Sequence, residues 1–288
     1  MFDGVHLGHQ QVIRQAVSDA HQLESSSLCV TFDKHPASVI APERAPLLIQ
    51  SLDQRLEAIR ALGVDATLIL PFDEAMSQIP AEAFIQGLAV DLGRISSICV
   101  GAQFAFGQDR KGNVKLLQQL GQELNFVAHG TASVALDGET VSSTRIRQAI
   151  TGGQLDLAGQ MLGREYALAG KVIRGDQRGR ELGFPTANLE ITGRCTPPNG
   201  VYAAHAEVDG KPYRAAVNIG LRPTLKDPEP ALHVEAYLLD FAGEIYDRVC
   251  TLTFVGKLRE EQSFDSLDAL RAQIEKDVVQ ARYLFTQL

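Results

Sequence analysis

Tryptophan is absent from this chain of 288 residues, aromatic side chains make up only 6%, and there is no surplus of positive charge. The 27 Lys and Arg residues are outnumbered by 35 Asp and Glu residues, so the formal net charge is −8 at pH 7. A chain with this balance has no general attraction to nucleic acid or to an anionic membrane. We therefore expect neither partner, and we expect local positive groups to hold any phosphate ligand.

Cysteine is also scarce, and its spacing fits neither a zinc site nor a small disulfide framework. The four residues are Cys29, Cys99, Cys195 and Cys250. No apolar run is long enough to span a membrane, and the first twenty residues lack the basic and then apolar pattern of a secretion signal. These absences predict reduced thiols and a cytoplasmic location.

What is present is ordinary globular composition, with 45% hydrophobic and 22% charged residues, and a length that suggests two domains. Over residues 1–161, short apolar strands alternate with helices, which predicts a parallel sheet whose ligands lie at the carboxyl ends of its strands. Over 162–288 the periodicity changes to two, and Asp209-Gly210 is a strong hairpin signal. That half predicts a closed antiparallel barrel followed by a helix from Ser266.

A glycine-rich stretch over residues 175–188 is the most specific feature of the sequence. Gly175, Gly179 and Gly183 recur at four-residue spacing, which suits a backbone that folds closely over a phosphate. Thr186 and Asn188 share one side if the segment continues as a strand, and their oxygens suit a Mg²⁺–nucleotide complex. Any three of these residues indicate only a turn, but ten in this order favour a nucleotide site.

The run Gly-Arg-x-Leu-Gly-Phe-Pro-Thr-Ala-Asn over 179–188 resembles the signature of riboflavin kinase, and specifically of the bacterial bifunctional riboflavin kinase/FAD synthetase. The resemblance implies an α/β nucleotidylyltransferase-like (Rossmann-like) domain followed by an all-β, Greek-key-type barrel with a C-terminal helix. It also implies ATP as co-substrate and Mg²⁺ as cofactor. Riboflavin would be phosphorylated to FMN, and FMN would be adenylylated to FAD with release of pyrophosphate.

Two histidines, His6 and His9, lie in a glycine turn at the start of a predicted helix, where backbone N–H groups and the helix dipole favour an anion. His-x-Gly-His resembles the nucleotidylyltransferase motif, which implies that both imidazoles contact ATP phosphates and stabilise charge developing at the α-phosphate. Histidine is common at helix starts, so the four residues alone are a weak signal. The Phe-Asp-Gly-Val before them and the Gln after them match the FAD synthetase form.

A second helix start follows Val141. Its hydroxyl residues can cap free N–H groups, and Arg147 adds a cation nearby. The segment resembles the Ile-Ser-Ser-Thr-x-x-Arg motif of nucleotidylyltransferases, with Val in place of Ile. The match implies phosphate contacts from Ser142, Ser143, Thr144 and Arg147. Simple capping would explain the hydroxyl residues, so Arg147 carries more of the inference.

Three further residues are weaker candidates. His35 lies in a segment that resembles a Thr-Phe-x-x-His-Pro element, which implies a place in the flavin or nucleotide cleft, although a loop histidine without a role is equally compatible. The loop after residue 101 departs from the family because Ala105 stands where a basic residue is usual, so only Gln103 is retained as an ATP contact. Arg222 either contacts the flavin substrate or its phosphate, or merely packs.

The kinase reaction needs a base near the attacking hydroxyl and neutralisation of phosphate charge. Glu235 alternates with apolar residues in a predicted strand, which by itself is also what an outward-facing structural carboxylate looks like. The resemblance implies that Glu235 is the catalytic base.

The amino-terminal segment differs from the family pattern. There, a complete strand and a Gly-Asn pair precede Phe-Asp-Gly-Val-His, whereas Met1 stands in place of the Asn here. We expect a missing central strand to leave neighbouring strands with unpaired backbone groups. Either the protein begins upstream of Met1, or the adenylyltransferase half is damaged. In the second case the function is that of a riboflavin kinase with an inactive amino-terminal domain.

Overall fold

The computed structural model describes residues 1–175, 178–222 and 231–287, and the chain forms two compact units. One unit comprises Met1–Ile146 with Met161–Gly163, and the other comprises Arg147–Gln160 with Arg164–Leu288. The boundary between the units therefore falls within the helical segment of residues 147–163, near residue 162, where the sequence periodicity changes.

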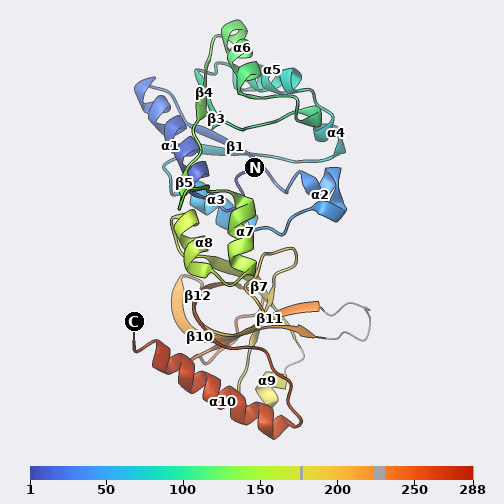
Figure 1. Ribbon diagram of the computed structural model, residues 1–288, viewed down its shortest axis with the longest axis vertical. Coiled ribbons are helices and arrows are strands. Elements are labelled where there is room, and N and C mark those ends of the chain that lie inside the picture. Colours follow the sequence, from blue (N-terminus) through green and yellow to red (C-terminus); the bar gives the residue numbers. More distant parts are fainter. Residues whose placement is uncertain (176–177, 223–230, 288) are drawn as a thin grey trace. The chain divides into compact units, whose positions relative to one another are not determined.

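The first unit has the alternation of helices and strands that the hydrophobic pattern predicts (Figure 1). Polar side chains cap the longer helices; Ser51, for example, forms a capping box with Gln54 at the start of α3. The elements are α1 (Leu7–Gln22), β1 (Leu28–Phe32), α2 (Ala37–Ile40), η1 (Pro42–Arg44), α3 (Leu52–Arg60), β2 (Ala66–Leu70), α4 (Glu74–Ser77), α5 (Ala81–Leu92), β3 (Ser97–Gly101), η2 (Gln108–Arg110), α6 (Val114–Leu124), β4 (Val127–Thr131), β5 (Ala135–Leu136), β6 (Glu139–Thr140) and α7 (Ser143–Thr151).

The predicted parallel sheet is present as two parallel pairs. β1 pairs with β2, in register from Leu28 opposite Ala66, and β3 pairs with β4, in register from Ser97 opposite Val127. In the described part of the chain no ladder joins β1 to β3, so each keeps one edge without a strand partner. The α/β class is confirmed, and helix α1 contacts both pairs: Ile13 packs with Cys29 of β1, and Asp19 accepts a hydrogen bond from Ser97 of β3.

Two apolar clusters hold this unit together. Val5, Ile13, Cys29 and Ile59 pack where α1, β1 and α3 meet. A second cluster between α5, α6 and the neighbouring strands is centred on Leu117, which is fully buried. Burying such side chains supplies the main driving force for each half of the unit.

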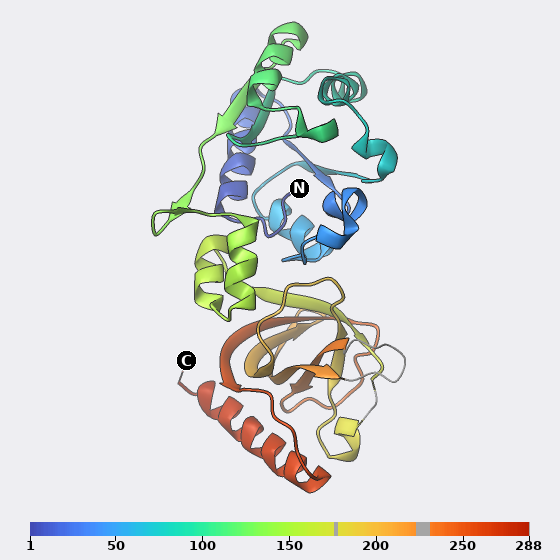
Figure 2. The same cartoon turned by 45° about the vertical axis from the view of Figure 1, so that its right-hand side comes forward.

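The second unit is a closed antiparallel barrel with a terminal helix, as predicted (Figure 2). Around the barrel the strand order is β10-β11-β8-β7-β12-β9. Asp209 and Gly210 both have positive φ (50° and 74°) and connect β9 to β10, which confirms the predicted hairpin. The elements are α8 (Leu155–Leu162), β7 (Ala167–Ile173), α9 (Arg178–Glu181), β8 (Ala187–Glu190), β9 (Gly200–Val208), β10 (Lys211–Arg222), β11 (Ala231–Leu238), β12 (Val249–Arg259) and α10 (Leu267–Leu284).

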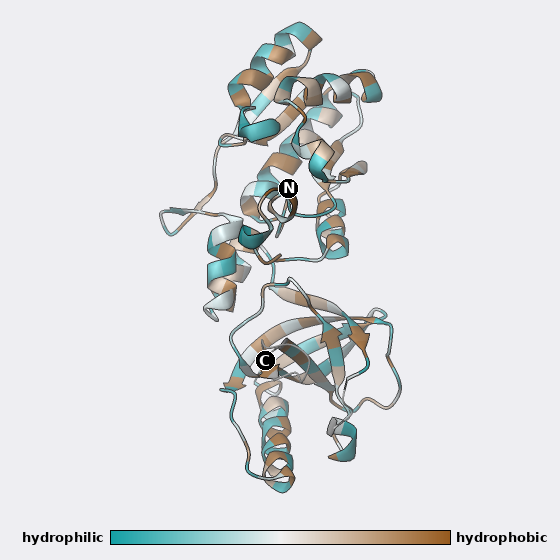
Figure 3. Ribbon diagram, turned by 90° about the vertical axis from the view of Figure 1, so that its right-hand side faces the viewer, coloured by the Kyte–Doolittle hydropathy of each residue, from teal (hydrophilic) through white to brown (hydrophobic). Residues whose placement is uncertain are grey.

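Helix α10 covers part of the outer barrel surface. Ala281 on α10 and Phe285 just after it pack against Ala203 and Ala216 of the barrel. On the same helix, the buried carboxylate of Asp277 accepts two hydrogen bonds, of 2.8 and 2.7 Å, from the Arg259 guanidinium. Polar and apolar residues are interspersed along the helices (Figure 3), and within the described ranges no helix combines the length and apolar character needed to cross a membrane.

Candidate active sites

A tight turn fixes the start of α1. Gly4 has φ of +86°, and a Cβ there would lie only 3.1 Å from the Ile49 side chain. The Asp3 carboxylate accepts the N–H of Ile49, and the Gln10 amide donates to the carbonyl oxygen of Val5 at 2.9 Å. These bonds hold the residue that follows the turn, His6, at the N-cap of α1.

The two histidines of the motif stack on one another. Their ring centroids are 3.6 Å apart with an interplanar angle of 21°, and His6 Nδ1 accepts the backbone N–H of His9 at 3.4 Å. Burial, with a smaller contribution from His6, lowers the pKa of His9 well below 6.5. The His9 ring is therefore neutral at pH 7, and it can offer a hydrogen bond to a phosphate but not a full positive charge.

The second helix start lies next to this turn. Ser142 Oγ accepts the N–H of Arg145 at 3.2 Å and caps α7, while Ser143 Oγ donates to the carbonyl oxygen of Asp3 at 2.9 Å. The starts of α1 and α7, far apart in sequence, thus lie side by side, which is the arrangement a single triphosphate site requires. Thr144 is exposed in the first turn of α7.

The two arginines of this segment lie in different units. Arg145 donates to the carbonyl oxygens of Leu136 and Glu139 and thereby supports the hairpin of β5 and β6. The boundary between the units falls before Arg147, whose carbonyl oxygen accepts the hydroxyl of Thr151 at 2.9 Å. Of the predicted phosphate contacts in this motif, Ser142, Ser143 and Thr144 share a unit with His6 and His9, and Arg147 does not.

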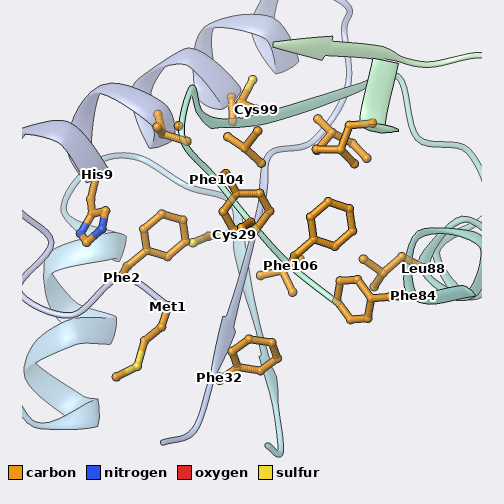
Figure 4. Close-up of a pocket in the computed structure, with 18 of the residues that line it drawn as sticks. Met1, Phe2, His9, Cys29, Phe32, Phe84, Leu88, Cys99, Phe104 and Phe106 are labelled. Atoms are coloured by element: carbon orange, nitrogen blue, oxygen red, sulfur yellow. The ribbon is translucent and has the colours of Figure 1, made fainter. Parts of the chain in front are cut away.

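A cavity of about 1730 Å³ in the first unit is lined from both parallel strand pairs. His6, His9, His35 and Gln103 all line it, so four of the sequence-predicted residues meet at one cavity. Figure 4 shows phenylalanine rings pointing into the same space. They include Phe2, Phe32, Phe84, Phe104 and Phe106.

Sequence reasoning missed this aromatic lining, although the spacing of Phe104 and Phe106 in one loop was a usable signal. Cys29 of β1 and Cys99 of β3 also line the cavity (Figure 4). Burial raises the pKa of Cys29 to about 11 and that of Cys99 to about 12. Both thiols are therefore protonated and are not nucleophiles at neutral pH.

The second candidate site lies on the outer face of the barrel. Val234 and Ala236 are buried inside it, whereas Glu235 between them is half-buried and faces outward. In the strand ladders Glu235 lies directly opposite Asn188 of β8 on one side and Asn218 of β10 on the other. The register therefore places a carboxylate between two amides.

The predicted pair of Thr186 and Asn188 shares this outer face. Ala187 and Leu189, which alternate with them, are buried in the barrel. Thr186 immediately precedes β8, so its hydroxyl lies on the same face as the Asn188 amide and the Glu235 carboxylate. These three side chains offer the hard oxygen atoms that Mg²⁺ prefers, and their donor chemistry fits that ion.

Glycine is required at the three positions near this face for different structural reasons. A Cβ on Gly175 would lie 2.4 Å from Asn188 Nδ2, and one on Gly179 would lie 3.2 Å from Thr186 Oγ1. Only Gly183 has positive φ, +88°. A short helix, α9, contains Gly179, and the missing side chains of Gly175 and Gly179 leave room for the site residues beside them. The predicted phosphate contact of the three glycines stays a prediction.

Four further residues belong to the turn and the strands around this face. The Phe184 ring contacts Tyr237 edge-on, with centroids 5.4 Å apart. Arg222 ends β10 in the backbone ladder, but its side chain lies outside the described part of the structure. Sequence reasoning did not select Asn218 as a site residue, because strand pairing between distant segments cannot be read from one strand's own pattern.

Comparison with known proteins matches both halves of the chain. A family model described as riboflavin kinase matches residues 162–285, and one described as FAD synthetase matches residues 1–145. A bifunctional riboflavin kinase/FMN adenylyltransferase from Pseudomonas fluorescens is 40% identical over 283 residues, covering 98% of this chain and 90% of that protein. The protein of the same name from Escherichia coli K12 is 36% identical, covering 99% of this chain and 90% of its own.

A solved structure has the same architecture. It is described as a macrolide-efflux protein from Streptococcus pneumoniae, is 28% identical in sequence, and aligns with a TM-score of 0.81 over 98% of this chain and 91% of its own. The likeness supports the fold of both units.

The fold, the paired helix starts and the barrel face together define a transferase that acts on phosphate-containing substrates. The chain belongs to the bifunctional riboflavin kinase/FAD synthetase family. Both enzyme domains are present, so the findings support the two-step activity and not the kinase-only alternative.

Proposed function

We propose that the barrel half, from residue 162 onward, transfers the γ-phosphate of ATP to the 5′-hydroxyl of riboflavin. The α/β half, residues 1–161, then adenylylates FMN to FAD with a second ATP and releases pyrophosphate. The observation that carries the kinase proposal is the placement of Glu235 directly opposite Asn188 on the outer face of the barrel. Three free cysteines that are buried, and substrates found inside cells, support action in the cytoplasm.

In the kinase reaction, Glu235 is the general base that accepts the proton of the attacking hydroxyl. Thr186 and Asn188 would hold Mg²⁺, which when bound neutralises charge on the transferred phosphate. Close contact of Gly175 with Asn188, and of Gly179 with Thr186, fixes the positions of both side chains. Gly179 and Gly183 bring backbone N–H groups to the ATP phosphates, together with Gly175.

The adenylylation reaction needs no side-chain base, because the FMN phosphate is already largely ionised at neutral pH. His6 and His9 donate hydrogen bonds to the ATP phosphates as the α-phosphate is attacked. The first turn of α7, with Ser142, Ser143 and Thr144, supplies further donors at a helix N-terminus.

The remaining residues complete the two substrate sites. The role of Arg147 as a phosphate contact stays a prediction from the sequence, and Gln103 contacts ATP. His35 contacts the flavin in the aromatic cavity, which is suited to a flat ring system. Arg222 stays a predicted contact of the flavin substrate, since its side chain lies outside the described part of the structure.

Incubation with riboflavin, ATP and Mg²⁺, followed by chromatographic separation of FMN and FAD, tests both steps. Glu235→Gln should slow FMN formation by about 10²- to 10⁴-fold and leave conversion of supplied FMN to FAD unchanged. His9→Asn should do the reverse and slow FAD formation by about 10²-fold. The exposed Lys211, changed to Ala, is the control and should alter neither rate. If Glu235→Gln keeps full kinase activity, Glu235 is not the catalytic base.

A further inference from the structure

Helix α1 carries a buried carboxylate in addition to the two histidines at its start. Asp19 lies near the other end of the helix and is only 7% exposed. Burying a carboxylate costs free energy unless hydrogen bonds or opposite charges compensate for the lost water. The partners of Asp19 therefore show what this side chain does in the fold.

Four side chains contact the Asp19 carboxylate, and three of them come from the second strand pair. Gln15, one turn earlier on α1, donates to it at 2.7 Å. From β3, Ser97 Oγ donates at 2.9 Å and Cys99 Sγ at 3.4 Å. His129 Nε2 of β4 lies 3.3 Å from the same carboxylate, and Figure 4 shows Cys99 beside α1. Asp19 thus contacts both strands of the pair.

The hydrogen bonds also keep this carboxylate charged. Burial by itself would raise the pKa of Asp19, but the hydrogen bonds from Gln15, Ser97 and Cys99, together with His129, lower it below its usual value. Asp19 is therefore ionised at neutral pH. Hydrogen bonds to an ionised acceptor are about twice as strong as those between neutral groups, so the contacts with β3 and β4 are well suited to fix the helix.

The same helix is attached to the first strand pair at a different point. Ile13 of α1 packs with Cys29 of β1. Within the described ranges no ladder joins β1 to β3, so backbone hydrogen bonds do not set the position of one pair relative to the other. Helix α1 bridges the two pairs, with an apolar contact to the first and a buried polar cluster, made of Asp19, Ser97, Cys99 and His129, to the second.

This bridge connects the two sides of the adenylylation cavity. Helix α1 begins directly after His6, whereas β3 ends at Gly101, two residues before Gln103. His6, His9 and Gln103 line the same cavity. A helix rises about 1.5 Å per residue, so Asp19 lies about 15 Å from His9 along a stiff rod. A shift of α1 at the polar cluster therefore moves the histidines relative to Gln103.

We propose that Asp19 is a positioning residue of the adenylylation site. Through its contacts with β3 and β4, it fixes the two histidines at the start of α1 relative to Gln103. The inference rests on the proposed function, because Asp19 itself contacts no substrate and acts through the residues that do.

The first test is the rate of FAD formation from supplied FMN, ATP and Mg²⁺ by the full chain carrying Asp19→Ala. The histidines act as the α-phosphate is attacked, so their displacement should lower kcat about tenfold. KM for ATP should stay within about twofold, because the interaction lost is one made in the transition state. FMN formation from riboflavin should be unchanged, which shows that the barrel is folded.

Asp65→Ala is the matched control. Asp65 accepts the backbone N–H and the hydroxyl of Ser27, each at 2.7 Å, and so joins the starts of β1 and β2 within one strand pair. Its loss removes a comparable polar contact without releasing α1 from β3, so kcat for FAD formation should stay within about twofold of the wild type. Circular dichroism at the assay temperature checks that both variants are folded.

The second test separates positioning from general damage to the fold. In a chain that already carries His6→Asn and His9→Asn, the groups that Asp19 positions are missing, and asparagine still suits the N-cap of α1. Adding Asp19→Ala to that chain should change kcat for FAD formation by less than about twofold. If Asp19 served only the stability of the unit, the tenfold loss would be repeated in this background.

Three results would overturn the inference, and they are distinguishable. If His9→Asn is slow but Asp19→Ala is no slower than Asp65→Ala, the positioning role is wrong and the proposed function stands. If the tenfold loss persists without the histidines, Asp19 acts through the fold alone. If the chain lacking both histidines forms FAD at the wild-type rate, their proposed role and the inference built on it fail together.

Discussion

The two candidate sites are built in different ways. On the barrel, the site residues Asn188 and Glu235 face each other because the strands that carry them are paired in a fixed register. In the α/β unit, His6 and Ser143 come together through turns and side-chain hydrogen bonds, beside a cavity of about 1730 Å³. Strand pairing positions the barrel site through many backbone hydrogen bonds. The site at the two helix starts depends instead on a few side-chain hydrogen bonds.

This difference has a consequence for sensitivity to mutation. A closed barrel has no free edge, so a change on its outer face alters one side chain while the ladder holds the others. In the α/β unit, a change at the turn before α1 alters the position of the whole helix start. The predictions below compare the two arrangements.

The largest effect is expected where α10 covers the barrel. Asp277→Asn removes the charge that pairs with the partly buried Arg259 guanidinium, which should lower the free energy of unfolding of the barrel by about 1.5–3 kcal/mol. Arg282→Gln, which removes the exposed ion pair between Arg282 of α10 and Asp240, should leave stability nearly unchanged. Urea unfolding followed by circular dichroism measures both changes.

If the ladder alone positions the kinase site, the kinase rate per folded molecule at 25 °C should be unchanged in Asp277→Asn. A lower kinase rate per folded molecule in Asp277→Asn would show that α10 also holds the site in place.

A smaller effect is expected at the close contact beside Asn188. The new Cβ of Gly175→Ala would lie 2.4 Å from Asn188 Nδ2, so the amide must turn away and FMN formation should fall about tenfold. Gly87→Ala in α5 is the matched control, because its new methyl group meets nothing within 4 Å. A Gly175→Ala enzyme with wild-type kinetics would show that Asn188 is not used as a ligand.

The smallest effect is expected from pH on the α/β unit. Because the pKa of His9 in the folded protein lies well below 6.5, the unfolded chain binds the proton first as pH falls. The contribution of neutral His9 to the free energy of unfolding is therefore fully present above pH 6.5. Below pH 6.5 it decreases, by at most about 1.4 kcal/mol per pH unit. Unfolding curves at pH 7.5, 6.5 and 5.5 measure the slope, and His9→Asn should flatten it. An equal slope in that variant would assign the effect to other groups.

Much of the architecture followed from local patterns. Alternating strands and helices predicted the α/β half, period-two strands predicted the barrel, and Asp209-Gly210 predicted its hairpin, because each depends on residues close in sequence. The helix starts at His6 and Ser142 were also predictable, since capping is a local property.

Other features could not be read in this way. In the glycine segment only Gly183 has positive φ, whereas Gly175 and Gly179 leave room for Asn188 and Thr186, which the spacing of the glycines did not indicate. The aromatic cavity and the boundary before Arg147 likewise depend on how distant segments pack.

The sequence by itself determined the two-part architecture, the motif residues and the kind of chemistry they suit, because composition, periodicity and motif spacing are properties of the chain. Only the tertiary structure decided that Glu235 lies between Asn188 and Asn218, and that Ser143 contacts Asp3. The physical reason is that strand register and helix contact are set by the joint packing of segments up to 140 residues apart, and no single segment carries that information.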